Sequence, residues 1–419
     1  MSRTHPSRQH VGARFLRAVL WISATLALVT LQGCSLGAHS TSQTLTLLSV
    51  FPLTGANGAL GQEMQRGVDL AVSQNTALGG GFQLGVTHVN ESLGAVGDVV
   101  AASISSGGVV GVVGPFSSET ALAIEPIIER AGITTITTSA TLAGLTLSAS
   151  AKAEGLDFTT LHPQGAPVAF LRLPQTSDAE GKSAADVMVA GGSRGLSAST
   201  VFIVDDGSPS AKAIVTSFGA ELRARRASVA GHVTIPNGVL SDPLSMVAAI
   251  VAAGPNAVFY AGDTLGAAQV RSALTLSGAP GLPLLAASAA ADNPGWSDAV
   301  GGPQLAGSTL ALLPARDLGK LSTSSSFVSA YEKMYSGEKP LPQAALAYDA
   351  AMDEINAIKS AISAGKAPTA SAVLAGVTGG VYHGASGDIA FDKNGDNTNP
   401  IPFSIYSCDS KGAWTYRGA

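Results

Sequence analysis

The stretch GVVGPFSSETALA, from Gly111 to Ala123, places hydroxyl groups where they could bind a ligand. A valine-rich run typical of a buried strand ends before Pro115, and residues 119–131 have the composition of a helix. Ser118 would therefore lie at a helix N-terminus, where backbone N–H groups lack partners within the helix and attract negative charge. Its hydroxyl could cap the helix or contact a bound anion.

A second group of hydroxyl side chains occupies the stretch TTSATLAG, from Thr137 to Gly144. It occupies the end of residues 133–139, whose threonine- and isoleucine-rich pattern predicts the next strand of a sheet. Ligands of open parallel sheets bind beyond the carboxyl ends of the strands. The two groups would therefore form one polar site if their strands are neighbours. Both groups also have the composition of ordinary helix caps, and the sequence leaves the two interpretations open.

Two short motifs resemble parts of catalytic sites, but the secondary structure predicted around them does not suit catalysis. The pentapeptide GGSRG, Gly191 to Gly195, matches the G-x-S-x-G pattern of serine hydrolases, but that motif needs a strand before it and a helix after it. Here the order is reversed, so we expect a turn at a helix C-terminus. Asp205 and Asp206 end a predicted strand, where acidic residues commonly solvate a loop. We therefore expect no enzyme.

The chain also lacks sequence patterns that bind metals or nucleotides. In DKNGDN, Asp392 to Asn397, the glycine stands fourth rather than sixth and no glutamate stands twelfth, so we expect a β-turn and not a calcium loop. The seven histidines are scattered, without the short paired spacing of zinc sites. No phosphate-cradling G-x-x-x-x-G-K-[ST] pattern occurs. We expect no metal and no cofactor.

Predicted strands and helices alternate along most of the chain. Apolar runs at 44–53, 81–89 and 108–114 alternate with stretches of helical spacing, and the alternation resumes at about residue 181 after a loop-rich segment. Such alternation indicates parallel strands joined by right-handed crossovers. A length of 419 residues suits two domains better than one. We therefore predict an α/β fold of two doubly wound, Rossmann-like lobes with a late β-hairpin.

Five stretches resemble, in the same order, the signatures of type I periplasmic binding proteins, and in particular the substrate-binding proteins of branched-chain amino acid (leucine/isoleucine/valine) ABC transporters. They are FPLTGANGALGQEMQRGVDLAV (51–72), GPFSSETALAIEPIIERAGITTITTSAT (114–141), FLRLPQTSDAEGKSAAD (170–186), LAYDAAMDEINAIK (346–359) and GVYHGASGDIAFDKNGD (380–396). The resemblance covers nearly all of residues 44–410.

This resemblance implies a ligand-binding cleft between two lobes that are joined by three crossing segments. We expect the crossings near Leu173, Leu310 and Gly379. The first lobe would then comprise residues 44–172 and 311–378, and the second residues 173–310 and 379–419. Closure around a ligand would be a hinge motion.

The resemblance also implies a set of ligand-binding residues. In amino-acid-binding members of the family, the first lobe holds the ligand carboxylate. Carried over by position, Ser118 supplies a hydroxyl, and the segment Ser139, Ala140 and Thr141 supplies backbone and hydroxyl groups. Leu60 falls where an aromatic side chain often covers the ligand.

The second lobe departs from the family pattern. The position that usually supplies an acid for the ligand ammonium falls on Ser288, and two aromatic positions fall on Ser210 and Asp263. Asp263 would either replace the missing acid or cap a helix. An ammonium group that is buried without a carboxylate costs several kcal/mol. This weakens the case for an α-amino acid, whereas a carboxylate, an amide or another small polar solute fits.

The first 33 residues have the pattern of a bacterial secretory signal peptide. Four arginines precede an apolar run from Ala18 to Leu31, which is short for a membrane span. The run ends in LQGC, which resembles a lipobox and implies lipid attachment at Cys34, with residues 34–43 as a tether. A cysteine that follows an ordinary signal peptide is the alternative. Removal of the signal leaves 20 basic against 29 acidic residues, a formal charge of −9, which argues against a nucleic-acid partner.

The sequence thus predicts a lipid-anchored solute-binding protein on the extracytoplasmic face of the cell membrane. It would act as a monomer and deliver a small polar solute to the permease subunits of an ABC importer. A ligand-sensing receptor module that signals to a partner protein is the alternative, because one fold can serve both roles.

Overall fold

The computed structural model describes residues 43–287 and 289–419. The predicted signal peptide, Cys34, the predicted tether except for Gln43, and Ser288 lie outside the described residues. Among the helices that the structure describes, none is long and apolar enough to cross a bilayer.

The first sheet has the strand order β2-β3-β1-β4-β5-β6. Its neighbouring strands are parallel, except that the short β2 pairs with β3 in the antiparallel sense. The strands are β1 (Gln43–Phe51), β2 (Ala77–Gly79), β3 (Phe82–Asn90), β4 (Val109–Val113), β5 (Thr134–Thr137) and β6 (Phe170–Arg172). The helices between β1 and β6 are α1 (Gly58–Ser73), α2 (Val96–Ser105), α3 (Ser118–Ala131), α4 (Ser148–Glu154) and α5 (Phe158–Leu161).

The second sheet has the strand order β15-β14-β11-β10-β9-β7-β8. Strands β7 to β11 pair in parallel, and β14 and β15 extend the sheet as an antiparallel hairpin. The strands are β7 (Thr200–Asp205), β8 (Ser228–Thr234), β9 (Ala257–Ala261), β10 (Leu284–Ala287), β11 (Thr309–Leu313), β14 (Ser404–Cys408) and β15 (Trp414–Gly418). Its helices are α6 (Ser177–Val189), α7 (Pro209–Ala224), α8 (Pro243–Ala253), α9 (Thr264–Leu276) and α10 (Trp296–Val300).

The two sheets are wound in the same way, which confirms the prediction of two doubly wound lobes. In the first sheet β1 lies between β3 and β4, and in the second β7 lies between β8 and β9. The winding therefore reverses between β1 and β4 and again between β7 and β9. Ligands of doubly wound sheets bind at the carboxyl ends of the strands beside such a reversal.

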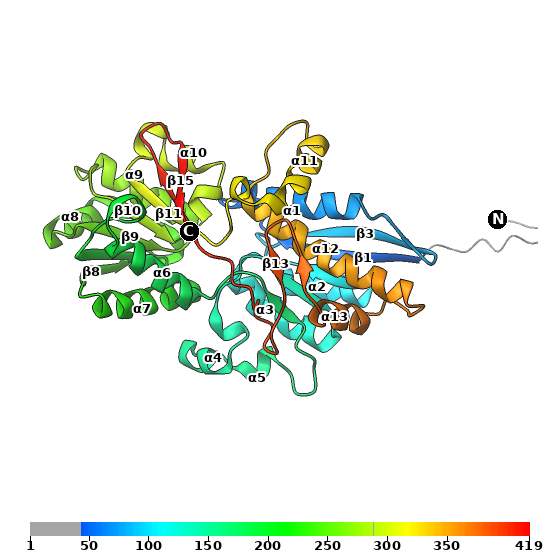
Figure 1. The fold of residues 1–419 in the computed structure, drawn as a ribbon. Helices are drawn as coiled ribbons and strands as arrows, with labels where there is room; N and C mark the ends of the chain where they lie inside the picture. The colour runs from blue at the N-terminus through cyan, green and yellow to red at the C-terminus, as the bar shows by residue number, and fades with distance from the viewer. Residues whose placement is uncertain (1–42, 288) are drawn as a thin grey trace, which may run out of the picture. The chain divides into compact units, whose positions relative to one another are not determined.

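The chain returns to the first lobe after β11. Helices α11 (Ser325–Met334), α12 (Pro342–Ser363) and α13 (Ala370–Thr378) follow, then the short hairpin β12 (Tyr382–His383) and β13 (Asp388–Ile389). Leu346, Ala350 and Ile355 of α12 belong to the same buried core as Leu47 and Phe51 of β1. Figure 1 shows this return as orange α12 lying beside blue α1.

The packing of the cores bears on where the chain crosses between the lobes. Leu173 and Leu313 pack in the first core, whereas Leu312 packs in the second, which agrees with crossings close to the first two expected positions. Ile389, Phe391 and Ile401 also pack in the first core, and Phe403 and Ile405 in the second. We therefore propose lobe boundaries as expected, except that the third crossing lies near Pro402 rather than near Gly379.

Candidate functional site

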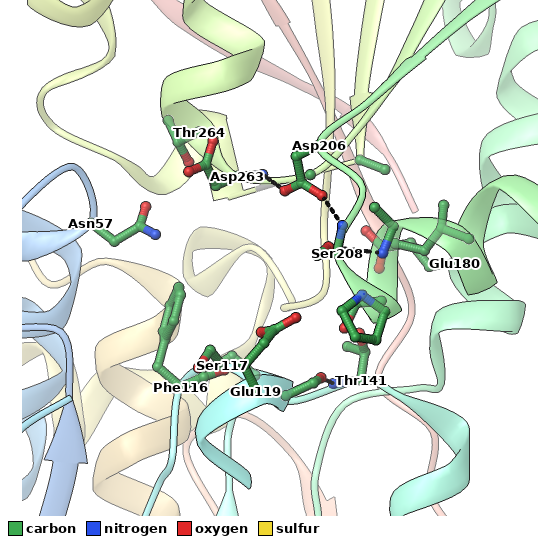
Figure 2. Close-up of a pocket in the computed structure, with 18 of the residues that line it drawn as sticks. Asn57, Phe116, Ser117, Glu119, Thr141, Glu180, Asp206, Ser208, Asp263 and Thr264 are labelled. Atoms are coloured by element: carbon green, nitrogen blue, oxygen red, sulfur yellow. Dashed lines mark hydrogen bonds between the residues drawn. The ribbon is translucent and has the colours of Figure 1, made fainter. Parts of the chain in front are cut away.

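A cavity of about 540 Å³ lies at the carboxyl ends of the strands in both sheets. The first lobe contributes residues that follow β1, β4 and β5. The second lobe contributes residues that follow β7, β8 and β9 and the last residue of β10, Ala287. Most of the lining residues are polar or charged, as Figure 2 shows. They are Asn57, Ser117, Ser118, Glu119, Ser139, Thr141, Glu180, Asp206, Ser208, Ser210, Asn237, Asp263, Thr264 and Gln343.

The two hydroxyl-rich groups after β4 and β5 meet at this cavity. Ser117, and not Ser118, caps α3, since the Ser117 Oγ accepts a hydrogen bond from the Thr120 N–H at 3.1 Å. The Ser118 Oγ accepts from the backbone N–H groups of Thr141 and Leu142 at 3.2 and 3.1 Å. Ser118 lines the cavity but is only 4% exposed. Its hydroxyl thus ties the two loops together, and the predicted cap at Ser118 is wrong.

The segment from Ser139 to Thr141 is also held by internal hydrogen bonds. The Thr137 Oγ1 accepts from the backbone N–H groups of Ser139 and Ala140 at 3.4 and 3.0 Å. The Ser139 hydroxyl donates to the carbonyl oxygen of Phe116 at 3.0 Å. Ser139 and Thr141 line the cavity, whereas Ala140 is fully buried behind it. The three residues therefore shape the wall, and their backbone donors already have acceptors.

Leu60 does not cover the cavity. Its side chain is fully buried in the core of the first lobe, together with Met64 and Phe51. Asn57 and Phe116 line this side instead. The expectation for Leu60 is wrong because α1 begins at Gly58 and turns the leucine inward, onto the face that packs against the sheet.

In the second lobe, Ser210 lines the cavity and Asp263 both lines it and caps a helix. The Asp263 Oδ1 accepts from the Gly266 N–H at 2.7 Å, so this oxygen caps α9. Asp206, which the sequence suggested only as a loop residue, forms the centre of this wall. Its carboxylate accepts from the Ser208 N–H at 2.9 Å and from the Asp263 N–H at 3.1 Å. Ser288 lies outside the described residues.

The electrostatics of the cavity are negative. Glu119, Glu180, Asp206 and Asp263 line it, and no Lys, Arg or His does so within residues 43–287 and 289–419. Burial raises the pKa of Glu180 to about 7. Burial also raises the pKa values of Glu119 and Asp263, and the neighbouring charge of Asp206 raises both further. The cavity is therefore a place where added positive charge is stabilised and added negative charge is opposed.

Several of these residues could not be singled out from the sequence. Glu180 lies on α6, and Gln343 lies in the first turn of α12, more than 200 residues from the loop of Ser118. Only the return of the chain to the first lobe brings α12 to the cavity. Asp206 and Glu119 did carry a usable signal. Asp206 directly follows β7, Glu119 lies in the first turn of the helix after β4, and both strands border a reversal of the winding.

A second cluster of ionisable groups, Glu125, Glu129 and His162, lies outside the cavity. The His162 Nδ1 contacts the Glu129 Oε2 at 2.9 Å, and its Nε2 contacts the Leu145 carbonyl oxygen at 2.8 Å and the Glu125 Oε1 at 3.2 Å. Burial alone would lower the pKa of His162, but the hydrogen bond and charge of Glu129 raise it. Both ring nitrogens thus lie within reach of acceptor oxygens, and the contact with Glu129 links His162 to α3.

A family model described as periplasmic binding protein matches residues 44–413. The chain belongs to this family. Its members are solute-binding proteins rather than enzymes. A comparison with curated proteins gave no match.

Solved structures share the fold of this periplasmic binding protein at low sequence identity. The branched-chain amino acid transporter substrate-binding protein of Streptococcus pneumoniae, in complex with isoleucine, is 21% identical with a TM-score of 0.73 over 89% of this chain and 99% of its own. A leucine-binding protein of Thermotoga maritima is 21% identical with a TM-score of 0.71, over 89% and 97%. A solute-binding protein of an ABC transporter from R. palustris, in complex with benzoate, is 18% identical with a TM-score of 0.67, over 90% and 96%.

Proposed function

We propose that this protein is a lipid-anchored extracytoplasmic solute-binding protein of an ABC importer. It captures a small polar solute between its lobes by hinge closure and delivers it to the permease subunits. The observation that carries the proposal is the cavity itself, which lies at the winding reversals of both sheets and is lined by both lobes. A solute that contacts both walls would stabilise the closed arrangement.

The ligands of structural relatives support a small solute of this size. The relatives from Streptococcus pneumoniae and R. palustris hold isoleucine and benzoate. A cavity of about 540 Å³ is within the usual range for a small-molecule site. We propose Ser118, Ser139, Thr141, Ser210 and Asp263 as wall residues of the solute site, and withdraw Leu60 and Ala140 as contacts.

A thermal-shift screen tests solute capture. The purified protein is heated with amino acids, short-chain acids, amides, amines, urea, aromatic acids and small peptides. A solute at one hundred times its dissociation constant adds about 2.7 kcal/mol of stability, which is a clear shift of the melting temperature. A hit that also reduces the radius of gyration in small-angle scattering supports hinge closure. A complete absence of shifts would contradict solute capture and favour the alternative of a receptor module that senses a partner protein.

Lipid attachment at Cys34 is tested separately in cells. The proposal expects the protein in the membrane fraction, with an acylated Cys34 as the mature N-terminus in mass spectrometry. The variant Cys34→Ala should lose the lipid and leave the membrane fraction. An unmodified mature protein in the medium would refute the anchor without bearing on solute capture.

A further inference from the structure

The backbone N–H groups that would hold an anion beside this cavity are largely taken up by the protein itself. The carboxyl group of Glu91 accepts from the backbone N–H groups of Phe116 and Ser117 at 2.9 and 3.0 Å, directly before α3. As described above, Thr137 and Ser118 satisfy the donors of residues 139–142, and Asp206 and Asp263 those before α7 and in α9. The N–H groups at the helix ends that favour anions thus already have acceptors within the protein.

The hydrogen-bond acceptors at the cavity, in contrast, are in surplus. Gln343 lines the cavity and is only 1% exposed, yet its Oε1 has no hydrogen-bond partner among the described residues. The Oδ1 of Asn57, on the same side, is buried and also lacks a described partner. A buried acceptor without a donor costs about 1–3 kcal/mol, so a solute donor that reaches either oxygen when the lobes close would recover that cost.

The charged side chains point to the same kind of solute. Glu119 belongs to the first lobe and Asp206 to the second, and Figure 2 shows the carboxyl group of Glu119 directed toward the wall that carries Asp206. Closure would bring like charges together, and an organic cation between them would turn this repulsion into attraction. Phe116 lies at the same cavity, where the face of its ring can contact a cation.

We infer that the cavity selects a positively charged organic solute, an aliphatic ammonium or guanidinium compound, and does not require a carboxylate on it. Glu119 and Asp206 supply the negative charge from the two lobes, and Gln343 and Asn57 supply neutral acceptors. This inference rests on the proposed function, because it names the class of solute for the same site.

Probes of equal length and different charge test the inference by isothermal titration calorimetry at pH 7.5. Pentylammonium, pentanamide and pentanoate share a five-carbon chain and carry positive, zero and negative charge, and agmatine adds a guanidinium. Leucine serves as the zwitterionic comparison. We expect the two cations to bind at least about tenfold more tightly than pentanamide, which corresponds to one charge-assisted hydrogen bond, and pentanoate to bind most weakly.

A matched pair of variants locates the effect. Glu119→Gln removes one charge from the cavity while keeping the side-chain shape, and Glu338→Gln removes one from an exposed ion pair with Arg66 that does not line the cavity. Glu119→Gln should weaken the cations about tenfold and leave pentanamide unchanged, whereas Glu338→Gln should change neither. Circular dichroism verifies that both variants fold.

The outcomes separate the inference from the proposed function. Tighter binding of leucine, pentanamide or pentanoate than of the cations would overturn the inference and leave solute capture intact. Equal loss of cation binding in both variants would overturn the role of Glu119. If no probe binds and the broader thermal-shift screen is also empty, the inference and the proposed function fail together.

Discussion

We expect Arg172→Met to destabilise the protein strongly, because this arginine is a fully buried charge that joins separate parts of the first lobe. Its Nη2 lies 2.6 Å and its Nε 3.0 Å from the Asp396 Oδ1, in the loop after β13. Its Nη1 donates to the Leu142 carbonyl oxygen at 2.6 Å, and its Nη2 also contacts the Thr146 Oγ1. The side chain thus connects β6, the wall segment after β5 and the return of the chain.

The magnitude follows from what the substitution leaves behind. Removing one partner of a buried ion pair costs about 3–5 kcal/mol, since the other charge and its acceptors lose their compensation. The Asp396 side chain keeps 23% exposure and its hydrogen bond from Thr146, so water can hydrate part of the orphaned carboxylate. The carbonyl oxygen of Leu142 is buried and loses its charged donor. We therefore place the loss for Arg172→Met at about 3 kcal/mol, the lower end of that range.

Urea unfolding followed by circular dichroism and tryptophan fluorescence measures this loss. Trp296 and Trp414 are close together in the second lobe, so their fluorescence separates its unfolding from that of the first lobe. Lys182→Met is the matched control, because it removes a cation from an exposed pair with Asp178 at 3.8 Å. Such exposed pairs contribute about 0–1 kcal/mol.

A double-mutant cycle completes the test. Asp396→Asn alone leaves the guanidinium buried with a neutral partner, and the combination of Arg172→Met with Asp396→Asn removes both charges. We expect the double variant to lose about 1–3 kcal/mol less than the sum of the two single losses. Additive losses, or a loss for Arg172→Met no greater than that for Lys182→Met, would refute the ion pair as the cause.

Three further predictions concern stability. Gly67→Ala should cost about 1–3 kcal/mol of stability, because a Cβ at Gly67 in α1 would lie 2.2 Å from the Ala344 carbonyl oxygen of α12. The control Gly97→Ala in α2 should be neutral or slightly stabilising, because a Cβ there meets nothing closer than 3.6 Å. Thermal unfolding of the two variants tests this difference. Phe218→Ala should cost about 3–5 kcal/mol of stability, since Phe218 is fully buried and stacks on Phe259 with ring centroids 3.9 Å apart. A cost below that of Leu244→Ala, a variant at an exposed site, would contradict this packing argument. Burial raises the pKa of Asp292 from its ordinary 3.8 to about 7, so the contribution of this group to stability is present below about pH 4 and is lost as the pH rises through 7. Asp292→Asn should therefore gain stability relative to the wild type between pH 5 and pH 8. Urea midpoints of the two proteins that change in parallel over these pH values would refute the pKa shift.

The winding of both lobes could be predicted because it depends on features that are local in the sequence. The valine-rich run 109–113 and the apolar run 257–261 are each bounded by turn-forming residues and followed by a helix, so their type and parallel pairing follow from the pattern. Helices α4, α5 and α13 were missed, because they are short and their stability comes from packing more than from periodicity. The chain between α11 and α12 is not helical, because Gly337 and Pro340 disfavour a continuous helix there.

The location of the site could be predicted from the sequence, but the hydrogen bonds of its residues could not. That residues 116–119, Ser139 and Thr141 face one cavity follows from the order of the strands. Whether the Ser118 hydroxyl faces a solute or its neighbouring loop depends on the positions of the Thr141 and Leu142 N–H groups, which tertiary packing sets. The sequence resemblance likewise assigned Leu60 by position, although the inward face of α1 removes it from the wall.

The polarity of this site shows how one fold can be adapted to solutes of opposite charge. A doubly wound sheet always presents helix N-termini at its carboxyl edge, and these favour anions when they are left open. Here Asp263 caps α9, Asp206 accepts the N–H group of Ser208 beside α7, and Glu91 accepts those before α3. Each carboxyl group occupies N–H groups at a helix end, and Asp206 and Asp263 also line the cavity. A change of only these side chains thus reverses the preferred charge of the solute without altering the backbone, which is why the fold identifies the site and the side chains decide its ligand.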